Sequence, residues 1–575
     1  MANPVIILNS IQDLLTTPGQ VGDIVAVNDL QTTAGNLFSW QQVATANQIF
    51  NPVNPTEVMG GTIYKNPNGF WVMMYDGPIN VRWFGAKGDG VQDDTMSFQA
   101  AVDTLAASIY VPSSEYGRGY VINKTGIIIR NNGITPNPSF ALTIFGDNKV
   151  RSKIWSVVPE STIFTVRSQF VKIESLDFEN RGTKDSKGIL IEAGTCTISD
   201  CYFGDFPGLD RSFIGIYNSV IFTNDDHNIK GCHFQECSIG IESDGEFKNS
   251  RINEFCEFYN CDTAIKLYSQ PGPDKDTEGV TIHNCAFYFC GNGDKKMPAI
   301  NIDKCPYTYI IDCMVDQCHF NALQMTNSSF SKLMGCWFAC PKAPDDTSVV
   351  LLNGLNSDLF INNCNFNDCK RYGIEIVGDK IPNPRPEPPY PALHIVISNS
   401  SFYPYVDLTP DADVCKQHAV GQIYIHNAND VLIQACNLYY INDFQTKCSA
   451  PPDTWNAIVA SKDDYNLSSV LIDACYINGN IFKGNPKIDV RLTNCRNKFT
   501  VKAGIGVIEA NSNVFTVDHG LTVLPGQAIS VTATNGTNFD LITAGIFNNQ
   551  IRFIRQFISN QAISISYYAA VFNDF

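Results

Sequence analysis

The chain has 575 residues, which is long enough for a large core and one or two smaller domains. Its net charge of -17 and pI near 4.9 argue against nucleic acid as a partner, because phosphate binding requires clustered Lys and Arg. The first residues carry no basic segment before their apolar run, and no stretch reaches the ~20 apolar residues that span a bilayer. We therefore expect a soluble, unprocessed protein without membrane insertion.

Residues 1–80 resemble a small β-rich module. Apolar runs at 23–28, 62–66 and 70–75 alternate with Gly, Pro and Asn turns, a pattern typical of strands. No catalytic pattern stands out in this part of the sequence. The module is expected to serve either as an attachment piece or as a cap on the domain that follows.

Residues 81–112 combine a glycine turn at Gly88 and Gly90 with an amphipathic helical pattern. Asp93 or Asp94 is placed to cap that helix. These two carboxylates and Asp89 also have the composition of a metal or catalytic loop, but turn and cap duty explains each of them. We expect a helix that closes the open N-terminal end of the next domain, whose bare backbone edge would otherwise recruit other strands.

A short pattern then returns ten times between about residue 197 and residue 497. It consists of an aliphatic residue, two mostly polar residues, a cysteine, any residue, and an aromatic or aliphatic residue. Successive copies are 23 to 39 residues apart. A repeat whose apolar positions recur while its length varies is typical of a solenoid. The cysteine position is occupied by Cys201, Cys232, Cys256, Cys285, Cys313, Cys336, Cys364, Ser400, Cys436 and Cys475.

The 20 cysteines raise the questions of disulfides and of metal binding. Several pairs, such as Cys232 and Cys237, have four residues between them, which is not the two-residue spacing of common zinc sites. These cysteines recur at the same position of each repeat. This favours a structural role in which they stack as small apolar side chains in buried ladders. We therefore predict free structural thiols, with no metal and no cofactor.

The segment FGAKGDGVQDDT (84–95), followed by a helix and by Ile109–Pro112, resembles the start of the right-handed parallel β-helix of pectate-lyase-like proteins. The resemblance is strongest to bacteriophage tailspikes that degrade surface polysaccharide. It implies an all-β fold with a β-helix at 113–500, a parallel homotrimer, and attachment to the phage tail or another tail protein through residues 1–80. It also implies a virion protein that is made in the host cytoplasm and acts outside the bacterial cell.

After residue 500 the cysteine pattern stops and alternating strands with Asn-Gly turns follow. The resemblance implies that residues 501–575 form a C-terminal β-domain that holds three chains in register. A simple cap on a monomer is the alternative. The trimer is preferred because Leu190, Leu351, Val377 and Val459 are apolar at outward positions of the repeat.

Aligning the repeats also predicts which residues face outward together on one sheet. Stacked coils, at ~4.8 Å each, would join these positions into a continuous face. The first column runs Glu242, Lys266, Asn301, Gln324, Leu351, Glu375, Tyr424 and Val459. The second column runs Asp244, Tyr268, Asp303, Thr326, Asn353, Val377, His426 and Ser461.

Glycoside hydrolysis needs two carboxyl groups at a defined separation. Glu242, Asp244 and Asp303 are the preferred catalytic candidates, since both possible pairs come near the ~6.5 to 9.5 Å of an inverting enzyme. Glu375 lies about three coils beyond Asp303, which is too far to pair with these acids within one chain. It would therefore act only across two chains of a trimer. Alternatively, these acids have no catalytic role and are solvated surface residues of an acidic protein. Substrate-binding candidates are Lys266, Tyr268, Asn301, Gln324, Tyr424, His426 and Trp455, the last in a long loop where its ring would stack on a sugar.

Two other functions fit the sequence. In a polysaccharide lyase, Tyr424 and His426 would act as base and acid, with Arg371 or Arg385 neutralising a uronate carboxylate. In a non-catalytic receptor-binding spike, the same face would bind glycan without cutting it.

Overall fold

The computed structural model divides the chain into two compact units, Met1–Ser331 and Lys332–Phe575, and each is described by itself. All secondary structure below lies in the described residues. These are 5–10, 12–28, 36–41, 61–104, 106–114, 118–123, 125–130, 141–182, 184–205, 211–219, 225–270, 276–378, 392–404, 421–439, 456–462, 469–477, 480–483, 488–497, 501–508, 514–518, 527–535, 542–547, 550–555 and 563–573.

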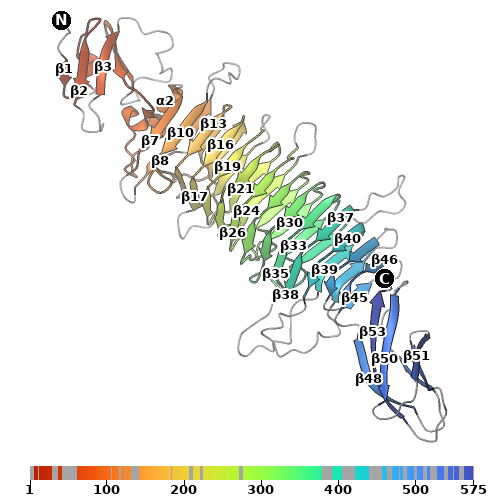
Figure 1. The fold of residues 1–575 in the computed structure, drawn as a ribbon. Coiled ribbons are helices and arrows are strands. Elements are labelled where there is room, and N and C mark those ends of the chain that lie inside the picture. The colour runs from red at the N-terminus through yellow and green to blue at the C-terminus, as the bar shows by residue number, and fades with distance from the viewer. Residues whose placement is uncertain are drawn as a thin grey trace, which may run out of the picture. The chain divides into compact units, whose positions relative to one another are not determined.

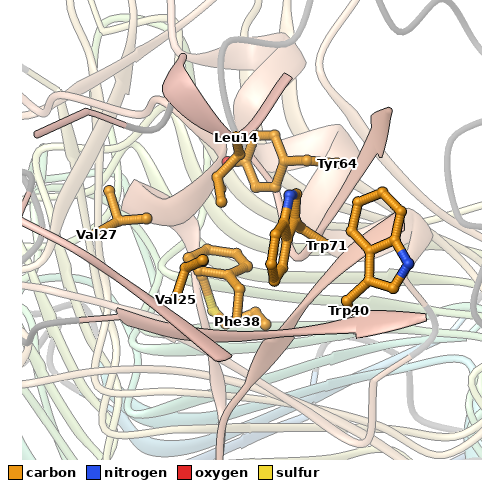
Figure 2. Close-up of a cluster of buried hydrophobic side chains, with 8 residues drawn as sticks. Leu14, Val25, Val27, Phe38, Trp40, Tyr64 and Trp71 are labelled. Carbon is orange, nitrogen blue, oxygen red and sulfur yellow. The ribbon is translucent and has the colours of Figure 1, made fainter. Parts of the chain in front are cut away.

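The N-terminal residues form a five-stranded sheet in the order β1-β2-β3-β5-β4 with one short helix beside it. Figure 2 shows its core of buried side chains, in which the rings of Trp40 and Trp71 meet edge to face at 5.0 Å. The Trp71 Nε1–H donates to the Thr17 carbonyl at 2.9 Å, so the buried indole keeps its polar partner. The elements are β1 (Ile6–Leu8), α1 (Asp13–Thr16), β2 (Ile24–Val27), β3 (Asn36–Gln41), β4 (Ile63–Asn66) and β5 (Gly69–Met74).

A 3₁₀ turn, η1 (Val81–Phe84), and the helix α2 (Thr95–Asp103) follow. Asp94 is fully buried and accepts from the backbone N–H groups of Lys87 and Gly88 at 2.8 and 3.1 Å. Burial raises the pKa of Asp94 to about 6. Asp93 accepts from the N–H of Thr95, the first residue of the helix, at 2.9 Å, whereas the N-cap residue Asp94 makes no side-chain capping bond to the helix. The acids of this segment thus bind backbone groups of the glycine turn and of the helix, as expected if they serve the turn and the helix start.

Beyond the helix, the first unit is a β-helix in which each coil gives one strand to each of three parallel sheets (Figure 1). The first sheet contains β6 (Ile79–Asn80), β7 (Ser108–Val111), β10 (Leu142–Gly146), β13 (Val171–Glu174), β16 (Cys196–Ser199), β19 (Asn228–Lys230), β22 (Arg251–Asn253), β25 (Thr281–His283) and β28 (Tyr309–Ile311). The second contains β8 (Tyr120–Ile122), β11 (Lys153–Ser156), β14 (Asp177–Asn180), β17 (Tyr202–Asp205), β20 (His233–Gln235), β23 (Glu257–Tyr259), β26 (Ala286–Tyr288) and β29 (Met314–Asp316). The third contains β9 (Ile127–Arg130), β12 (Thr162–Arg167), β15 (Lys187–Ala193), β18 (Ile214–Asn218), β21 (Ile239–Asp244), β24 (Thr263–Tyr268), β27 (Ile300–Asp303) and β30 (Leu323–Thr326).

The second unit repeats the same three-sheet coil. Its first sheet contains β31 (Lys332–Met334), β34 (Leu359–Asn362), β37 (Ala392–Ser398), β40 (Ala428–Gln434), β43 (Ser469–Asp473) and β46 (Asp489–Thr493). The second contains β32 (Trp337–Ala339), β35 (Asn365–Cys369), β38 (Ser401–Pro404), β41 (Asn437–Leu438), β44 (Tyr476–Ile477) and β47 (Arg496–Asn497). The third contains β33 (Val350–Asn353), β36 (Ile374–Val377), β39 (Gly421–His426), β42 (Asn456–Ser461) and β45 (Asn480–Lys483).

After residue 500 the pairing changes from parallel to antiparallel. One three-stranded sheet has the order β48-β53-β50 and a second has the order β49-β52-β51. The strands are β48 (Val501–Ile508), β49 (Val514–Asp518), β50 (Gln527–Asn535), β51 (Ile542–Phe547), β52 (Gln550–Arg555) and β53 (Ile563–Asn573).

The cysteine pattern lies inside the coils. Every described cysteine is free, and all are buried except the half-buried Cys495. Most thiols of the repeat donate to a backbone carbonyl of the preceding coil, as Cys232 does to Ile198 at 3.6 Å. The aromatic position two residues later forms a stack, with the rings of Phe234 and Phe258 at 4.6 Å and 5°. The predicted buried ladder is therefore present, and it fixes the phase of every coil.

The residue before each repeat cysteine has a left-handed backbone conformation. The φ angle is +51° at Asp200, +60° at Gly231 and +53° at Asn284. Gly, Asn and Asp tolerate this conformation best, so they fill most copies of the turn between the first and second sheets. Aliphatic residues before the turn and the phenylalanine after it point inward on either side.

Candidate functional site

The two outward columns exist on the third sheet of the first unit. In the first column Glu242 pairs in register with Lys266, which pairs with Asn301, which pairs with Gln324. In the second column Asp244 pairs with Tyr268, which pairs with Asp303. We call this surface of β21, β24, β27 and β30 the acidic face.

Glu242 is held in an ion pair on the acidic face. Its Oε1 lies 2.7 Å from the Lys266 Nζ, and the Glu242 side chain is only 13% exposed, against 41% for Lys266. The pair therefore presents a fixed carboxylate beside an accessible ammonium group, both able to hydrogen-bond sugar hydroxyls.

Asp303 has a different environment on the same face. Its Oδ1 is buried and has no hydrogen-bond partner. Burial raises the pKa of Asp303, and the nearby Lys304 opposes this shift. The Lys304 Nζ itself lies 5.2 Å from the centre of the Tyr268 ring. A carboxyl group that is partly desolvated and lacks a partner is suited to carry a proton and to give it up, as a general acid must.

Asp244 lies between these two groups. Tyr217, a residue that the repeat alignment did not single out, lies one coil earlier and pairs in register with Glu242. Burial, followed by the charges of Asp244 and Glu242, raises the pKa of Tyr217. Extending the first column one coil toward the N-terminus would have found this tyrosine, because its spacing fits the repeat.

The separations on the acidic face follow from the sheet spacings. Asp244 and Asp303 occupy one column two coils apart, or about 9 to 10 Å between backbones. Glu242 and Asp244 are two residues apart on one strand, or about 6.6 Å. These backbone separations are compatible with carboxyl groups at the ~6.5 to 9.5 Å that leaves room for a water molecule in an inverting glycosidase.

Glu375 belongs to the second unit and is not an open carboxylate. It is 7% exposed, accepts a hydrogen bond from the Ser348 hydroxyl, and pairs with the Arg371 guanidinium at 3.2 Å. Its strand neighbours are Leu351 and Tyr424, as the first column predicted. In this arrangement Glu375 holds an arginine in place, and we do not retain it among the preferred catalytic acids.

Tyr424 and His426 are joined by a third side chain. The Ser461 hydroxyl donates to the Tyr424 oxygen at 3.1 Å, and the His426 Nδ1 lies 2.8 Å from the Ser461 Oγ. The Tyr424 ring stacks on the buried Tyr372 ring at 5.1 Å. We call Tyr424, Ser461 and His426 the relay cluster. Trp455, the expected stacking residue, lies outside the described residues.

Another acid with a perturbed pKa lies on the second sheet of the first unit. Burial raises the pKa of Asp177 to about 7, with Glu179 contributing in the same direction. The Lys153 Nζ lies 3.1 Å from Asp177, and the Arg181 guanidinium covers the Trp155 ring at 3.3 Å. These groups form a closed ionic cluster, because Asp177 is only 2% exposed.

The described residues contain neither a metal-binding cluster nor a membrane-spanning helix. No group of three or more His, Cys, Asp and Glu side chains there is arranged to hold a metal ion. No helix in that part of the chain is long and apolar enough to cross a bilayer.

Comparison with known proteins agrees with this architecture. Residues 218–384 match a family model described as the right-handed β-helix region. No curated protein matches the chain. Among solved structures, the chain is similar to the tailspike gp61 of Pseudomonas phage phi297, with a TM-score of 0.51 and 11% identity over 87% of this chain and 100% of that one.

Two other tailspikes resemble the chain less closely in structure. Tailspike protein 3 of bacteriophage CBA120 has a TM-score of 0.43 and 13% identity over 84% of this chain and 78% of that one. The tailspike gp49 of Acinetobacter baumannii bacteriophage Fri1, described as a capsular polysaccharide depolymerase, has a TM-score of 0.40 and 11% identity, covering 99% and 98%. At these identities the likeness concerns the fold. The chain is thus a right-handed parallel β-helix protein, a fold that it shares with phage tailspikes.

Proposed function

We propose that the protein is a phage tailspike depolymerase and that its acidic face hydrolyses glycosidic bonds of a bacterial surface polysaccharide. One observation carries the assignment of the chemistry. Asp303, whose pKa is raised by burial, shares an outward column with Asp244, while Glu242 beside them is neutralised by Lys266. Carboxyl groups whose environments differ in this way can divide the roles of acid and base between them.

In the proposed reaction Asp303 is the acid and Asp244 is the base. The protonated Asp303 gives its proton to the glycosidic oxygen as the bond from that oxygen to the anomeric carbon breaks. Asp244 takes a proton from a water molecule whose oxygen bonds to the anomeric carbon from the opposite side. Inversion of configuration is the expected outcome, because the backbones that carry the two carboxyl groups are about 9 to 10 Å apart, whereas a retaining mechanism needs carboxyl groups ~5 to 5.5 Å apart.

The remaining groups of the face would bind sugar hydroxyls. Lys266, Asn301 and Gln324 form one polar row, and Tyr268 adds an aromatic ring next to Asp303. Attachment to a phage tail through the N-terminal module and assembly into a parallel homotrimer belong to the same proposal. So does action on the outside of the host cell.

Replacing Asp244 and Asp303 singly by Asn tests the proposal. The substrate is purified capsular polysaccharide from a bacterial strain on whose lawn the wild-type protein produces a clearing zone. We expect each variant to lose at least about a hundredfold in the rate at which new reducing ends appear, since each removes one acid–base partner. Asp312→Asn, on an exposed turn of the same unit, serves as the control. Full activity of both variants would refute the assignment.

The relay cluster supports a second function, polysaccharide lyase. The Ser461 hydroxyl, held by His426, directs its proton toward the Tyr424 oxygen. In this function the Tyr424 oxygen would be the base that takes the proton next to the uronate carboxylate. A lyase would leave an unsaturated uronate that absorbs ultraviolet light, with activity lost in Tyr424→Phe and kept in Asp303→Asn. A non-catalytic spike would bind the polysaccharide saturably and leave its length unchanged.

A further inference from the structure

Two exposed aromatic side chains stack at the edge of the acidic face. Tyr307 and Phe330 belong to neighbouring coils, in the turns that lead from the third sheet to the first. Their ring centres are 5.1 Å apart with 14° between the ring planes, and the two residues are 43% and 45% exposed. We call this pair the aromatic platform. The Tyr307 turn starts directly after Asp303, the last residue of β27, so the Cα atoms of these two residues are at most ~14 Å apart.

The backbone conformation at these two positions does not suit aromatic residues. The φ angle is +56° at Tyr307 and +58° at Phe330, in the left-handed region that Gly, Asn and Asp tolerate best. The same position, two residues before a strand of the first sheet, holds Asp226, Asn249 and Gly279 in the three preceding coils, with φ of +57°, +51° and +68°. The local folding of the turn therefore does not explain why two bulky rings follow.

Other side chains hold the two turns in shape. The Ser328 Oγ accepts from the Cys305 N–H at 3.1 Å, and the Ser331 Oγ accepts from the Thr308 N–H at 3.1 Å. Both serines are fully buried. The two rings can therefore be removed without removing the side-chain contacts that fix these turns.

The exposed area of the aromatic platform limits what it can bind. An aromatic side chain has about 150 to 250 Å² of surface, so the exposed fractions of the two residues amount to roughly 200 Å². A stable protein–protein interface needs about 800 Å² on each partner. The platform is thus too small to hold a partner chain by itself. It is wide enough for a sugar ring, whose C–H groups pack against the negative face of an aromatic ring.

The surroundings leave one ring face available and connect it to the acidic face. A backbone hydrogen bond of 3.3 Å joins the turn of Gly279 to the turn of Tyr307. Gly279 has no side chain that could cover the Tyr307 ring on the side opposite Phe330. The exposed Lys304, in the Tyr307 turn, has its Nζ 5.2 Å from the centre of the Tyr268 ring. Polar and aromatic groups therefore continue from the acidic face to the platform.

We propose that the aromatic platform is a sugar-binding subsite, which holds a pyranose ring of the polysaccharide beside the bond that the acidic face cuts. This inference rests on the proposed function and adds a subsite to it. The glycan extends from Asp303 along the turn and stacks the C–H face of one sugar on Tyr307 and Phe330. Such stacking holds the substrate before and during the reaction alike, so it lowers KM and leaves kcat unchanged.

The test compares the double variant Tyr307→Asn/Phe330→Asn with wild type on the capsular polysaccharide described above. We expect KM to rise at least about tenfold, and about two- to tenfold in each single variant, with kcat changed by less than about threefold. The melting temperature should stay the same or rise, because Asn suits the left-handed backbone better than Tyr or Phe. A structural role of the rings would instead lower the melting temperature, and that result would overturn the inference.

Phe170→Asn is the matched control. Phe170 is 42% exposed with φ of +56° in the turn before β13, five coils or ~24 Å from Tyr307. It should leave KM unchanged. Unchanged KM in the double variant, with Asp244→Asn and Asp303→Asn inactive, would overturn this inference alone. A lower particle mass of the double variant in light scattering would also overturn it, because the rings would then join chains. Full activity of both acid variants would instead overturn the proposed function.

Discussion

At the scale of single residues, the acids of this protein differ through their surroundings. Glu242 is neutralised by Lys266, whereas Asp303 has a buried oxygen without a partner. Asp94 and Asp177 are buried acids with pKa values raised to about 6 and about 7, and both lie in closed clusters that hold backbone or cationic groups. A perturbed pKa therefore marks a catalytic candidate here only where the group also lies on an open face.

The buried imidazole of His227 gives a prediction for stability against pH. His227 is 1% exposed, its Nδ1 accepts from the Cys196 N–H at 3.2 Å, and burial lowers its pKa from 6.5 to about 4. Between these values the unfolded chain binds a proton that the folded chain does not. The neutral His227 imidazole therefore contributes fully to the free energy of unfolding above pH 6.5, the pKa of the unfolded chain, and this contribution is lost as the pH falls below that value. We expect the free energy of unfolding to lose about 2 kcal/mol from this group between about pH 7 and pH 5.

Urea unfolding of wild type and His227→Gln at several pH values measures this contribution. The comparison between the two proteins is needed because Asp94 and Asp177, with raised pKa values, stabilise the fold as the pH falls. The variant should show the weaker loss of stability on acidification. Identical pH dependence in the two proteins would contradict the prediction.

At the scale of elements, the coil depends on its buried stack. Phe258 is fully buried between the rings of Phe234 and Phe287, at 4.6 and 4.8 Å. Phe255, three residues earlier, is 75% exposed in a turn with φ of +64°. The two phenylalanines therefore differ in environment but lie in the same coil, and Phe255 is the natural control for Phe258.

Phe258→Ala should destabilise the first unit by about 3 to 5 kcal/mol, because it leaves a cavity in a stacked core. Phe255→Ala should change stability by no more than about 0.5 kcal/mol. Denaturant midpoints of the two variants provide the measurement. Similar losses in both would show that the stack contributes little beyond exposed apolar surface.

At the scale of the whole molecule, the cysteines make a countable prediction. Every described cysteine is free, and the sequence contains 20. Under denaturing, non-reducing conditions a thiol reagent should titrate close to 20 groups per chain, whereas the native protein should react at few of them because buried thiols are inaccessible. Recovery of only a few thiols after denaturation would mean that disulfides are present.

The homotrimer remains a prediction. Of the four outward apolar residues on which it rests, Leu190, Leu351 and Val377 are half-buried and so remain partly exposed. Val459 is only 8% exposed, so it does not form an open apolar surface in the single chain. Large exposed apolar side chains lie elsewhere, such as Phe255 at 75%, Trp337 at 44% and Phe360 at 44%. Light scattering should give three times the chain mass of 63.6 kDa. A particle of a single chain mass would rule the trimer out.

The sequence by itself determined the fold, the phase of the coils and the two outward columns. It could do so because one inward cysteine and one inward phenylalanine per coil fix which residues point out. The structural role predicted for the acids of the glycine turn is confirmed, since each acid accepts from a backbone N–H nearby in sequence.

Only the tertiary structure decided the environment of each outward residue. The lysine that neutralises Glu242 and the arginine and serine that hold Glu375 come from neighbouring coils or loops at variable spacing. Burial of one Asp303 oxygen likewise depends on side chains packed around it. Repeat periodicity sets the direction of a side chain, but its charge state depends on contacts that the period does not encode.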